Sequence, residues 1–367
     1  MKIICQKSAL TAAVNTVLKA VPVRTTMPIL ECILIDASDG EISLTANDME
    51  LGIRTKVDGD VLEKGCIALE AKLFSEIVRK LPDNDVYIET DESFKALIKC
   101  EKAKFNIAAK PGEDFVSLPV VEKTNAIHIS QMSLRDVIRQ TIFSTSDNES
   151  NRLMAGELFD ISGDQLKVVA LDGQRIAIRR ISLKESYDPV KMIVPGKTLS
   201  EISKILSGGI DDEVSVYYTD NHILFEFDQT VVLSRLIEGE YYQIDRMISS
   251  DYNTKFVINK HEFQNCIERA SLLVRESDRK PVIISITDHS LEMKISSAIG
   301  SMDEDIDIVK EGKDMMIGFN QRFVLEALRV VEDEEITVYM VNSKSPFIIR
   351  NEDSSYIYLI LPISFIA

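Results

Sequence analysis

The stretch Met192–Tyr217, MIVPGKTLSEISKILSGGIDDEVSVY, carries a pattern that occurs three times in the chain. In each copy a basic residue is followed by a glutamate and then by a second basic residue, always at the same spacing. The copies are Lys72, Glu76, Arg79; Lys197, Glu201, Lys204; and Arg322, Glu326, Arg329, each 125 residues after the one before. A period of this length indicates repeated domains, because the units of solenoid proteins are only about 20–50 residues long.

The repeated unit is predicted to be a helix followed by a strand. In the first copy Phe74, Ile77, Val78 and Leu81 are spaced i, i+3, i+4 and i+7, which places them on one apolar face of a helix. An acidic turn and a run of alternating polarity follow in every copy, and such alternation is typical of a half-buried strand. These runs are DNDVYIE from Asp83, DDEVSVYY from Asp211 and EDEEITVYM from Glu332.

A second amphipathic helix is predicted near the start of each repeat, followed by a strand. The apolar positions of these helices are Leu10, Ala13, Val14, Val17, Leu18; Leu134, Val137, Ile138, Thr141, Ile142; and Phe263, Cys266, Ile267, Ala270, Ser271. The strands that follow are ILECILIDAS from Ile29, GELFDIS from Gly156 and PVIISIT from Pro281. Each domain is therefore expected to be a near-duplication of one unit made of a helix and strands.

The remaining apolar runs predict an α+β fold in which helices pack against antiparallel sheet. Several runs alternate in polarity and are separated by Asp, Gly, Asn or Ser, which favour turns. At 367 residues the chain also exceeds the roughly 250–300 residues at which a single core stops growing. We therefore expect three similar domains, over residues 1–122, 123–250 and 251–367, with polar linkers at Val120–Ala126 and Ile248–Thr254.

Composition and charge restrict the class of protein. Hydrophobic residues make up 45% of the chain and charged residues 28%, as in soluble globular proteins, and no apolar run approaches the ~18 residues of a membrane span. The N-terminus has no long apolar segment ending in a cleavage site, and the five cysteines show no CxxC spacing. These features predict a cytoplasmic protein with reduced thiols. The net charge of −17 argues against a protein that binds nucleic acid by charge alone.

No catalytic or metal site is recognisable from residue spacing. The segment PGKT at Pro195–Thr198 is similar to the end of a phosphate-binding loop, but that motif needs glycine where this chain has Lys191. The acidic clusters Asp211–Glu213, Asp303–Asp307 and Glu332–Glu335 lack the ligand spacing of a calcium loop and are expected to be solvated turns. The alternative to a binding protein is a phosphate- or nucleotide-binding enzyme with PGKT and these acidic turns as its site.

Basic residues recur on the predicted helices. Taken singly, each is best explained as part of a solvated helix face, and Glu76 with Arg79 forms an i,i+3 pair. Their recurrence at equivalent positions in three domains predicts instead one common basic surface, whereas an enzyme concentrates its unusual residues in one cleft. These positions are Lys72, Arg79, Lys80, Arg135, Arg139, Lys197, Lys204, Arg269, Arg322 and Arg329.

Five motifs, taken in order along the whole chain, resemble the bacterial sliding clamp, the β subunit of the replicative DNA polymerase. They are MPILECILIDAS at Met27, LTANDMELGI at Leu44, LDGQRIA at Leu171, IEGEYYQID at Ile237 and YIYLILPIS at Tyr356. The threefold repeat of about 120 residues and the total length agree with the same family.

The resemblance implies a head-to-tail homodimer whose six similar domains close a ring, with helices lining the hole. Duplex DNA would pass through the ring without being read in sequence. An acidic exterior around a basic lining would discourage binding anywhere but inside. The ring would tether the replicative polymerase, the clamp loader and other proteins through short linear peptides. The resemblance thus implies a processivity factor without catalysis, cofactor, metal or membrane partner.

Three sets of site residues are expected. Matching the family's motifs gives Arg24, the dimer-interface set and the cleft set, and the recurring basic helix positions supply the rest of the DNA-facing set. The DNA-facing set is Arg24, Lys72, Arg79, Lys80, Arg135, Arg139, Lys197, Lys204, Arg322 and Arg329. The dimer-interface set is Phe105, Leu272 and Leu273. A hydrophobic cleft that binds Leu- and Phe-containing peptides would be formed by Met154, Leu171, Gly173, Gln174, Arg175, Ile176, Tyr242, Arg246, Met247, Leu359, Ile360, Leu361, Pro362 and Ile363.

The sequence departs from the family pattern within the cleft. The family usually has Thr and His where this chain has Leu171 and Gln174, Pro where it has Tyr242, and a basic residue where it has Ser364. The chain also continues through Phe365–Ala367. These differences bear on which peptide the cleft prefers rather than on whether the cleft exists.

Overall fold

The computed structural model describes residues 1–124, 126–148, 150–248, 251–274 and 281–365. Contacts divide the chain into two compact units, residues 1–132 with 204–236 and residues 133–203 with 237–367. Asn125, Ser249 and Ser250 of the expected linkers lie outside the described residues, as do Ile366 and Ala367. Among the residues that are described, no helix is long and apolar enough to cross a membrane.

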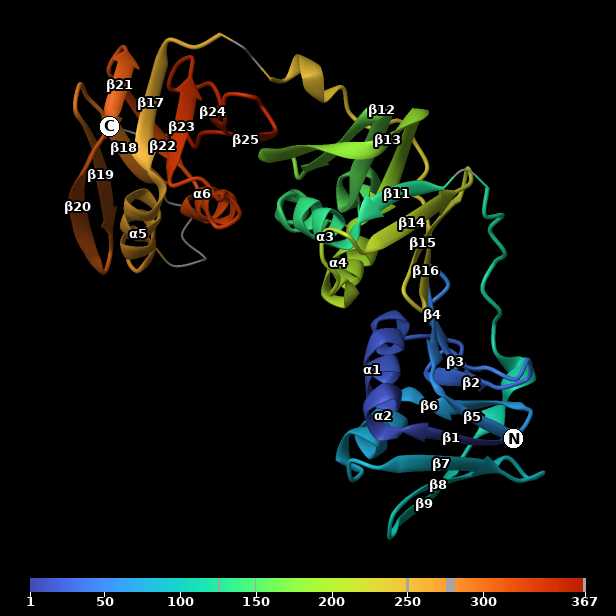
Figure 1. Cartoon of the computed structure of the whole chain (residues 1–367). Coiled ribbons are helices and arrows are strands. Elements are labelled where there is room, and N and C mark those ends of the chain that lie inside the picture. The colour runs from blue at the N-terminus through green and yellow to red at the C-terminus, as the bar shows by residue number, and fades with distance from the viewer. Residues whose placement is uncertain (125, 149, 249–250, 275–280, 366–367) are drawn as a thin grey trace. The chain divides into compact units, whose positions relative to one another are not determined.

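All six helices expected from apolar spacing are present (Figure 1). They are α1 (Lys7–Val17), α2 (Ala71–Lys80), α3 (Gln131–Arg139), α4 (Gly196–Ile205), α5 (Lys260–Ser271) and α6 (Gln321–Leu328). In α2 the apolar side chains of Phe74, Ile77 and Val78 are buried, as their spacing requires. Short 3₁₀ turns lie at η1 (Leu18–Ala20), η2 (Gly112–Asp114), η3 (Ile142–Ser144), η4 (Arg152–Ala155) and η5 (Ile244–Arg246).

Side chains that precede several helices cap their first turns. Glu70 accepts hydrogen bonds from the N–H groups of Lys72 (3.1 Å) and Leu73 (2.6 Å) at the start of α2. Asn259 and Asn320 do the same at the starts of α5 and α6. These caps satisfy N–H groups that have no partner within the helix, so they fix where each helix begins.

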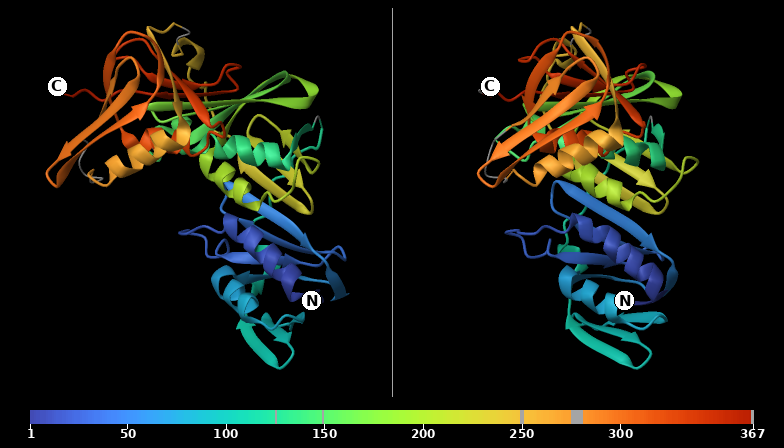
Figure 2. Two further views of the ribbon diagram at one scale, coloured as in Figure 1. Left: turned by 60° about the vertical axis from the view of Figure 1, so that its left-hand side comes forward. Right: turned by 90° about the vertical axis from the view of Figure 1, so that its left-hand side faces the viewer.

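The first unit contains α1, α2 and two antiparallel sheets. The sheets have the orders β5-β1-β7-β8-β9 and β10-β6-β2-β3-β4-β16-β15-β14-β11. Helix α1 packs on α2, β3 and β4, and Figures 1 and 2 show the two helices side by side. The strands are β1 (Lys2–Gln6), β2 (Cys32–Asp36), β3 (Ile42–Asn47), β4 (Leu51–Val57), β5 (Gly59–Glu63), β6 (Cys66–Glu70), β7 (Asp85–Thr90), β8 (Lys95–Cys100), β9 (Ala103–Ala108), β10 (Lys110–Pro111), β11 (Ile127–Ser130), β14 (Glu213–Tyr218), β15 (His222–Phe227) and β16 (Thr230–Arg235).

The second unit contains α5, α6 and two further antiparallel sheets. Their orders are β12-β13-β25-β24-β23-β17-β21 and β20-β19-β18-β22. Helix α5 packs on α6, β17, β19 and β20, and α6 packs on β25. The strands are β12 (Gly156–Leu171), β13 (Arg175–Pro195), β17 (Thr254–Asn259), β18 (Val282–Ile286), β19 (Ser290–Ser297), β20 (Gly300–Asp307), β21 (Val309–Gly312), β22 (Met315–Phe319), β23 (Glu335–Met340), β24 (Phe347–Arg350) and β25 (Tyr356–Ile360).

Both large sheets join strands from neighbouring expected domains. In the first unit β4 pairs with β16, so that Gly52 lies opposite Leu233. In the second unit β13 pairs with β25, so that Ile176 lies opposite Leu359. A sheet that continues in this way leaves no unpaired edge at the junction.

The expectation that Asp303–Asp307 forms a solvated turn was wrong. These residues lie in β20, an edge strand of the four-stranded sheet, where Ile306 is buried while its acidic neighbours are more exposed. Residue type alone suggested a turn, but alternate positions of the segment supply the buried face of a strand.

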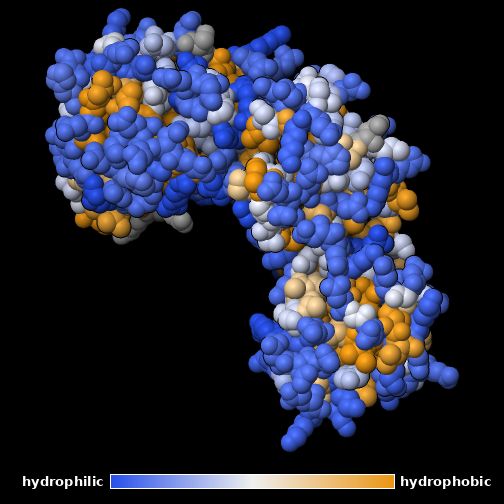
Figure 3. Space-filling view, in the orientation of Figure 1, coloured by the Kyte–Doolittle hydropathy of each residue, from blue (hydrophilic) through white to orange (hydrophobic). Residues whose placement is uncertain are grey.

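The face in Figure 3 shows hydrophilic side chains over much of the surface and apolar residues in separate patches.

Candidate functional site

A tight turn between β12 and β13 forms the centre of the site. One Asp172 carboxylate oxygen accepts hydrogen bonds from the N–H groups of Gln174 (2.9 Å) and Arg175 (3.1 Å). The N–H of Asp172 in turn donates to the carbonyl of Arg175 over 3.3 Å. Gly173 has a φ of 89°, a left-handed conformation that glycine adopts without the steric cost of a Cβ. The LDGQR sequence thus supplies both the side-chain acceptor and the glycine that this turn needs.

The last strand completes the site by pairing with β13. Ile360 lies opposite Arg175, and the N–H of Leu361 donates to the carbonyl of Gln174 over 2.8 Å. Because side chains alternate along a strand, Leu359 and Leu361 point to one face and Ile360 to the other. Leu359 belongs to the apolar cluster around the turn, whereas Ile360 belongs to the core cluster that includes α5 and α6.

An apolar pocket of about 260 Å³ lies between the turn and the end of β25. Most of the residues expected in a peptide cleft line it, together with Pro346, which carries no motif and which the sequence analysis missed. Pro346 is brought there because β24 pairs with β25 and Pro346 immediately precedes β24. The lining residues are Met154, Leu171, Gly173, Gln174, Arg175, Ile176, Tyr242, Met247, Pro346, Leu359 and Leu361.

Ile360, Arg246, Pro362 and Ile363 were expected in the cleft but do not line this pocket. Ile360 faces the core, and Arg246 lies along a neighbouring groove. Pro362 and Ile363 follow the end of β25, where the N–H of Ile363 donates to the carbonyl of Gly318 over 2.8 Å. The tail therefore reaches the pocket with Leu359 and Leu361 and then runs along β22.

Arg175 is the charged residue of the pocket wall, and it is 5% exposed. Its Nε donates to Asp172 over 2.8 Å, and its two terminal nitrogens donate to the Glu326 carboxylate and to the Phe143 carbonyl. The guanidinium also lies over the ring of Phe323, 4.4 Å from its centre. A buried cation is tolerated only where its donors are satisfied in this way.

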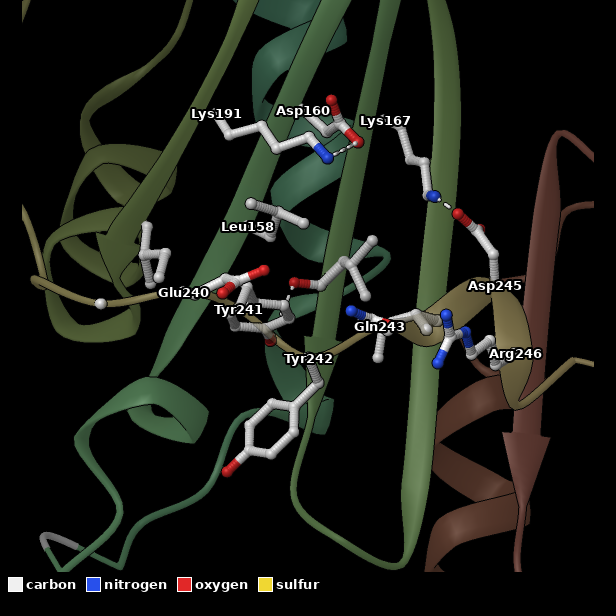
Figure 4. A pocket seen from close by; sticks show the side chains of 14 residues that line it. Leu158, Asp160, Lys167, Lys191, Glu240, Tyr241, Tyr242, Gln243, Asp245 and Arg246 are labelled. Carbon is white, nitrogen blue, oxygen red and sulfur yellow. Dashed lines mark hydrogen bonds and ion pairs between the residues drawn. The ribbon is translucent and has the colours of Figure 1, made fainter.

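A polar groove of about 600 Å³ adjoins the apolar pocket and shares Tyr242 with it (Figure 4). Lys167 binds Asp245 over 2.9 Å, and this hydrogen bond lowers the pKa of the Asp245 carboxyl. Lys191 lies 3.6 Å from Asp160, and Figure 4 shows Tyr242 pointing away from both ion pairs. This groove is larger than the apolar pocket, but its charges already pair with one another, so it offers little to an apolar ligand.

Glu157 at the start of β12 is a buried carboxyl group behind the site. It is 0% exposed, and neither of its carboxylate oxygens has a hydrogen-bond partner among the described residues. Burial raises its pKa to about 8, and the nearby Thr141 hydroxyl offsets this shift only in part, since that hydroxyl donates to the Val137 carbonyl. The Tyr241 hydroxyl, which donates to the carbonyls of neighbouring strand residues, likewise has its pKa raised, first by burial and then by Glu157.

The expected DNA-facing residues lie on or beside the helices. Lys72, Arg79 and Lys80 are on α2; Arg135 and Arg139 on α3; Lys197 and Lys204 on α4; Arg322 on α6; Arg329 directly after α6; and Arg24 in the segment before β2. Several of them form ion pairs, including Arg79 with Glu76 (2.5 Å), Arg139 with Glu332 (2.9 Å) and Arg329 with Glu268 (3.5 Å). The helix faces thus carry mixed charge with arginine side chains that remain largely exposed.

The expected interface residues lie beside open sheet edges. Phe105 is in β9, an edge strand, and is 37% exposed. Leu272 is 79% exposed, while Leu273 packs against the core and lies near Gly300, the first residue of edge strand β20. An unpaired edge with an exposed apolar side chain is a template for pairing with another chain.

The alternative enzyme reading finds no support in the geometry. Strand β13 runs to Pro195 and helix α4 begins at Gly196, so no glycine-rich loop that could hold a phosphate lies between them at PGKT. Within the part of the chain that the structure describes, no three His, Cys, Asp or Glu residues cluster as metal ligands. All five cysteines are free thiols, and burial raises the pKa of Cys5 to about 12.

Comparison with known proteins accounts for nearly the whole chain. Three models of the DNA polymerase III beta subunit match it: the N-terminal domain over residues 1–119, the central domain over 128–243 and the C-terminal domain over 245–364. The chain belongs to the DNA polymerase III β subunit family. The resemblance found in the sequence motifs is therefore confirmed.

Individual members of the β subunit family agree closely with this chain. A solved structure described as a DNA polymerase III beta subunit, from Eubacterium rectale, is 61% identical to this chain in sequence. Its TM-score is 0.97, and the match covers 100% of this chain and 99% of that one. The sliding clamp of Bacillus subtilis is 35% identical, with a TM-score of 0.95 and full coverage of both chains. The beta sliding clamp of Staphylococcus epidermidis is 33% identical over 360 residues, 95% of each chain.

Proposed function

We propose that this chain is a DNA sliding clamp, a non-catalytic ring that encircles duplex DNA and tethers the replicative polymerase and other proteins to it. The observation that carries this proposal is the apolar pocket formed by the LDGQR turn and the end of β25, in a chain that matches the β subunit family from end to end. The pocket would accept Leu and Phe side chains of short peptides from the polymerase and the clamp loader.

Ring closure is proposed to join β9 of one copy to β20 of a second copy, head to tail. Both strands are sheet edges, and their charges are complementary: Lys102 and Lys104 are at β9, whereas β20 carries Asp303, Glu304 and Asp305. Phe105 and Leu272 would supply apolar contacts beside the paired strands. Two such junctions close a ring because each copy offers one edge of each kind.

Within the ring, the domains are proposed to span residues 1–122, 123–250 and 251–367, with their helices toward the DNA. Exposed arginines and lysines of these helices would contact phosphates, which carry no sequence information, so the ring could slide. The ion pairs that several of these arginines form with glutamates would keep the affinity for DNA low. Topology rather than affinity would then hold the ring, in the cytoplasm of a bacterial cell.

The test is retention on circular and linear DNA. After loading by a clamp loader, the protein should remain on nicked circular duplex during gel filtration and should leave once the circle is cut. The physical reason is that a closed ring can leave only over an end. Equal retention on both DNAs at moderate salt would contradict the proposal, since direct affinity would then be the cause.

A further inference from the structure

The turn at the pocket is built twice in this chain. At the end of β3, an Asp48 carboxylate oxygen accepts hydrogen bonds from the N–H groups of Glu50 (3.0 Å) and Leu51 (2.7 Å), as Asp172 does from Gln174 and Arg175. Met49 has a φ of 77°, close to that of Gly173. The N–H of the residue after β25, Leu361, binds the Gln174 carbonyl, just as the N–H of Arg235 at the end of β16 binds the Glu50 carbonyl.

This duplication makes Leu51 the counterpart of Arg175. Leu51 is 1% exposed, so the turn accepts a buried leucine at this position. Burying a charge is costly, and a buried ion pair seldom stabilises a fold more than apolar residues of similar size do. The fold therefore does not require arginine at position 175. We look for the role of this arginine in the groups that its guanidinium contacts.

The contact that distinguishes Arg175 is Glu326 on α6. One carboxylate oxygen of Glu326 binds Arg175, and the other accepts a hydrogen bond from Nε of Arg322 over 2.9 Å. The Arg322 side chain is 67% exposed, that of Glu326 21% and that of Arg175 6%. The carboxylate thus joins a solvent-facing arginine of the helix to a buried arginine of the pocket wall.

The repeat supplies a contrast for Glu326. Its counterpart on α2, Glu76, is paired with Arg79 over 2.5 Å on an exposed helix face, and the Glu76 side chain is 45% exposed. Phe323, next to Arg322 in α6, also covers the Arg175 guanidinium. In the third copy of the repeat, helix α6 therefore contributes a carboxylate and an aromatic ring that hold the guanidinium of Arg175, a residue of the pocket wall.

We propose that Glu326 is a positioning residue that holds Arg175 in the wall of the peptide pocket and couples that pocket to phosphate contacts made by Arg322. The proposal rests on the clamp function proposed above. A DNA phosphate that binds Arg322 draws the Arg322 guanidinium away from Glu326. The Glu326 carboxylate then interacts with Arg175 alone, and this interaction becomes stronger. DNA in the ring therefore tightens the pocket wall and raises peptide affinity, and by reciprocity a bound peptide raises the affinity for DNA.

The experiment measures the affinity of a Leu/Phe-containing polymerase tail peptide by fluorescence anisotropy, with and without a short linear duplex at low salt. For the unmodified dimer, duplex should strengthen peptide binding by about fivefold, the lower end of common coupling strengths. Arg322→Ala should show the tightened affinity already without DNA and no further change with it. Glu326→Gln should weaken peptide binding and abolish the effect of DNA.

Glu76→Gln is the matched control, because it neutralises the equivalent glutamate on a helix that does not contribute to the pocket. It should leave peptide affinity and its response to DNA unchanged, and thermal unfolding of every variant establishes that the fold is intact. The coupling is contradicted if Glu326→Gln and the unmodified protein bind the peptide equally well and neither responds to DNA. That result would not contradict the proposed clamp function. Absence of peptide binding in the unmodified protein would count against the clamp function itself.

Discussion

The N–H of Leu361 donates to the carbonyl of Gln174 over 2.8 Å, which joins the end of the last strand to the turn that follows β12. These two residues are far apart in the sequence, yet the pairing of β13 with β25, which this bond extends, brings both of their side chains to one pocket. The pocket therefore depends on the tail being in place, and its ligand affinity can be altered from the tail without touching the turn.

Removing the tail should abolish peptide binding. Deletion of Leu361–Ala367 removes Leu361 from the pocket lining. Residues at the centre of such grooves cost about 2 kcal/mol or more when lost, so peptide affinity should fall more than tenfold. Fluorescence anisotropy measures the affinity, and sedimentation should still show a dimer because β9 and β20 are unaffected. Leu361→Arg is a second variant, chosen because Arg235 occupies the equivalent position in the first unit. It removes the leucine side chain but keeps the hydrogen bond between Ile363 and Gly318, so it tests the leucine side chain alone. An unchanged dissociation constant in both variants would mean that the peptide binds elsewhere.

Filling the turn should close the pocket while preserving the fold. Gly173→Met copies Met49, which already adopts a φ of 77° in the equivalent turn. A side chain in this conformation costs about 1–2 kcal/mol, so thermal unfolding should shift down slightly. The new side chain would extend from a pocket-lining position toward Met154, whose Sδ and Cε lie 3.9–4.0 Å from the added Cβ, and peptide affinity should be lost. Gly163→Met, at a φ of 61° in a different part of β12, should show the same small destabilisation with normal peptide binding.

The dimer should open when the exposed apolar residues beside the sheet edges are replaced. Phe105→Ala combined with Leu272→Ala removes two side chains proposed to meet the partner, and such central contacts cost about 2 kcal/mol or more each. Leu273 is a poorer target, since it packs against its own core and its loss would weaken the fold. Leu62→Asp is the control: Leu62 is 53% exposed on β5, the opposite edge of the sheet that contains β9. Sedimentation at micromolar concentration should show monomer for the double variant and dimer for the control, and the reverse result would place the interface on the wrong edge.

Stability should fall as pH rises because of Glu157. Burial raises its pKa from 4.5 to about 8, so between these values the folded protein holds a proton that the unfolded chain has released. The free energy of unfolding must then decrease with rising pH across this window and level off above it. Glu157→Gln keeps the neutral shape at every pH and should remove this part of the slope in urea unfolding. Parallel pH profiles for the two proteins would show that Glu157 is ionised or solvated in the folded state.

Local sequence pattern was sufficient to predict the helices, and local chemistry also accounts for the pocket's turn. The spacing of Phe74, Ile77 and Val78 predicts α2 because a helix brings such positions to one face, whatever that face packs against. Asp172 and Gly173 likewise specify a turn through their own side chain and backbone. The family resemblance was also a property of the sequence, since it rests on motifs that lie in a fixed order.

Other features depended on which strands lie next to one another. Pro346 has no motif of its own and joins the pocket only through the register of β24 against β25. The acidic residues Asp303–Asp307 indicate a turn by type, but the pairing of β20 with β19 makes them an edge strand.

The sequence by itself determined the threefold repeat, the six helices, the α+β class and the family, because each follows from residues that are close together or in a fixed order. Only the tertiary structure decided that Ile360 faces the core while Leu361 faces the pocket, and that Arg175 meets Glu326. The physical reason is that local patterns set backbone conformation, whereas contacts between distant residues depend on strand register and helix packing, which no single segment encodes.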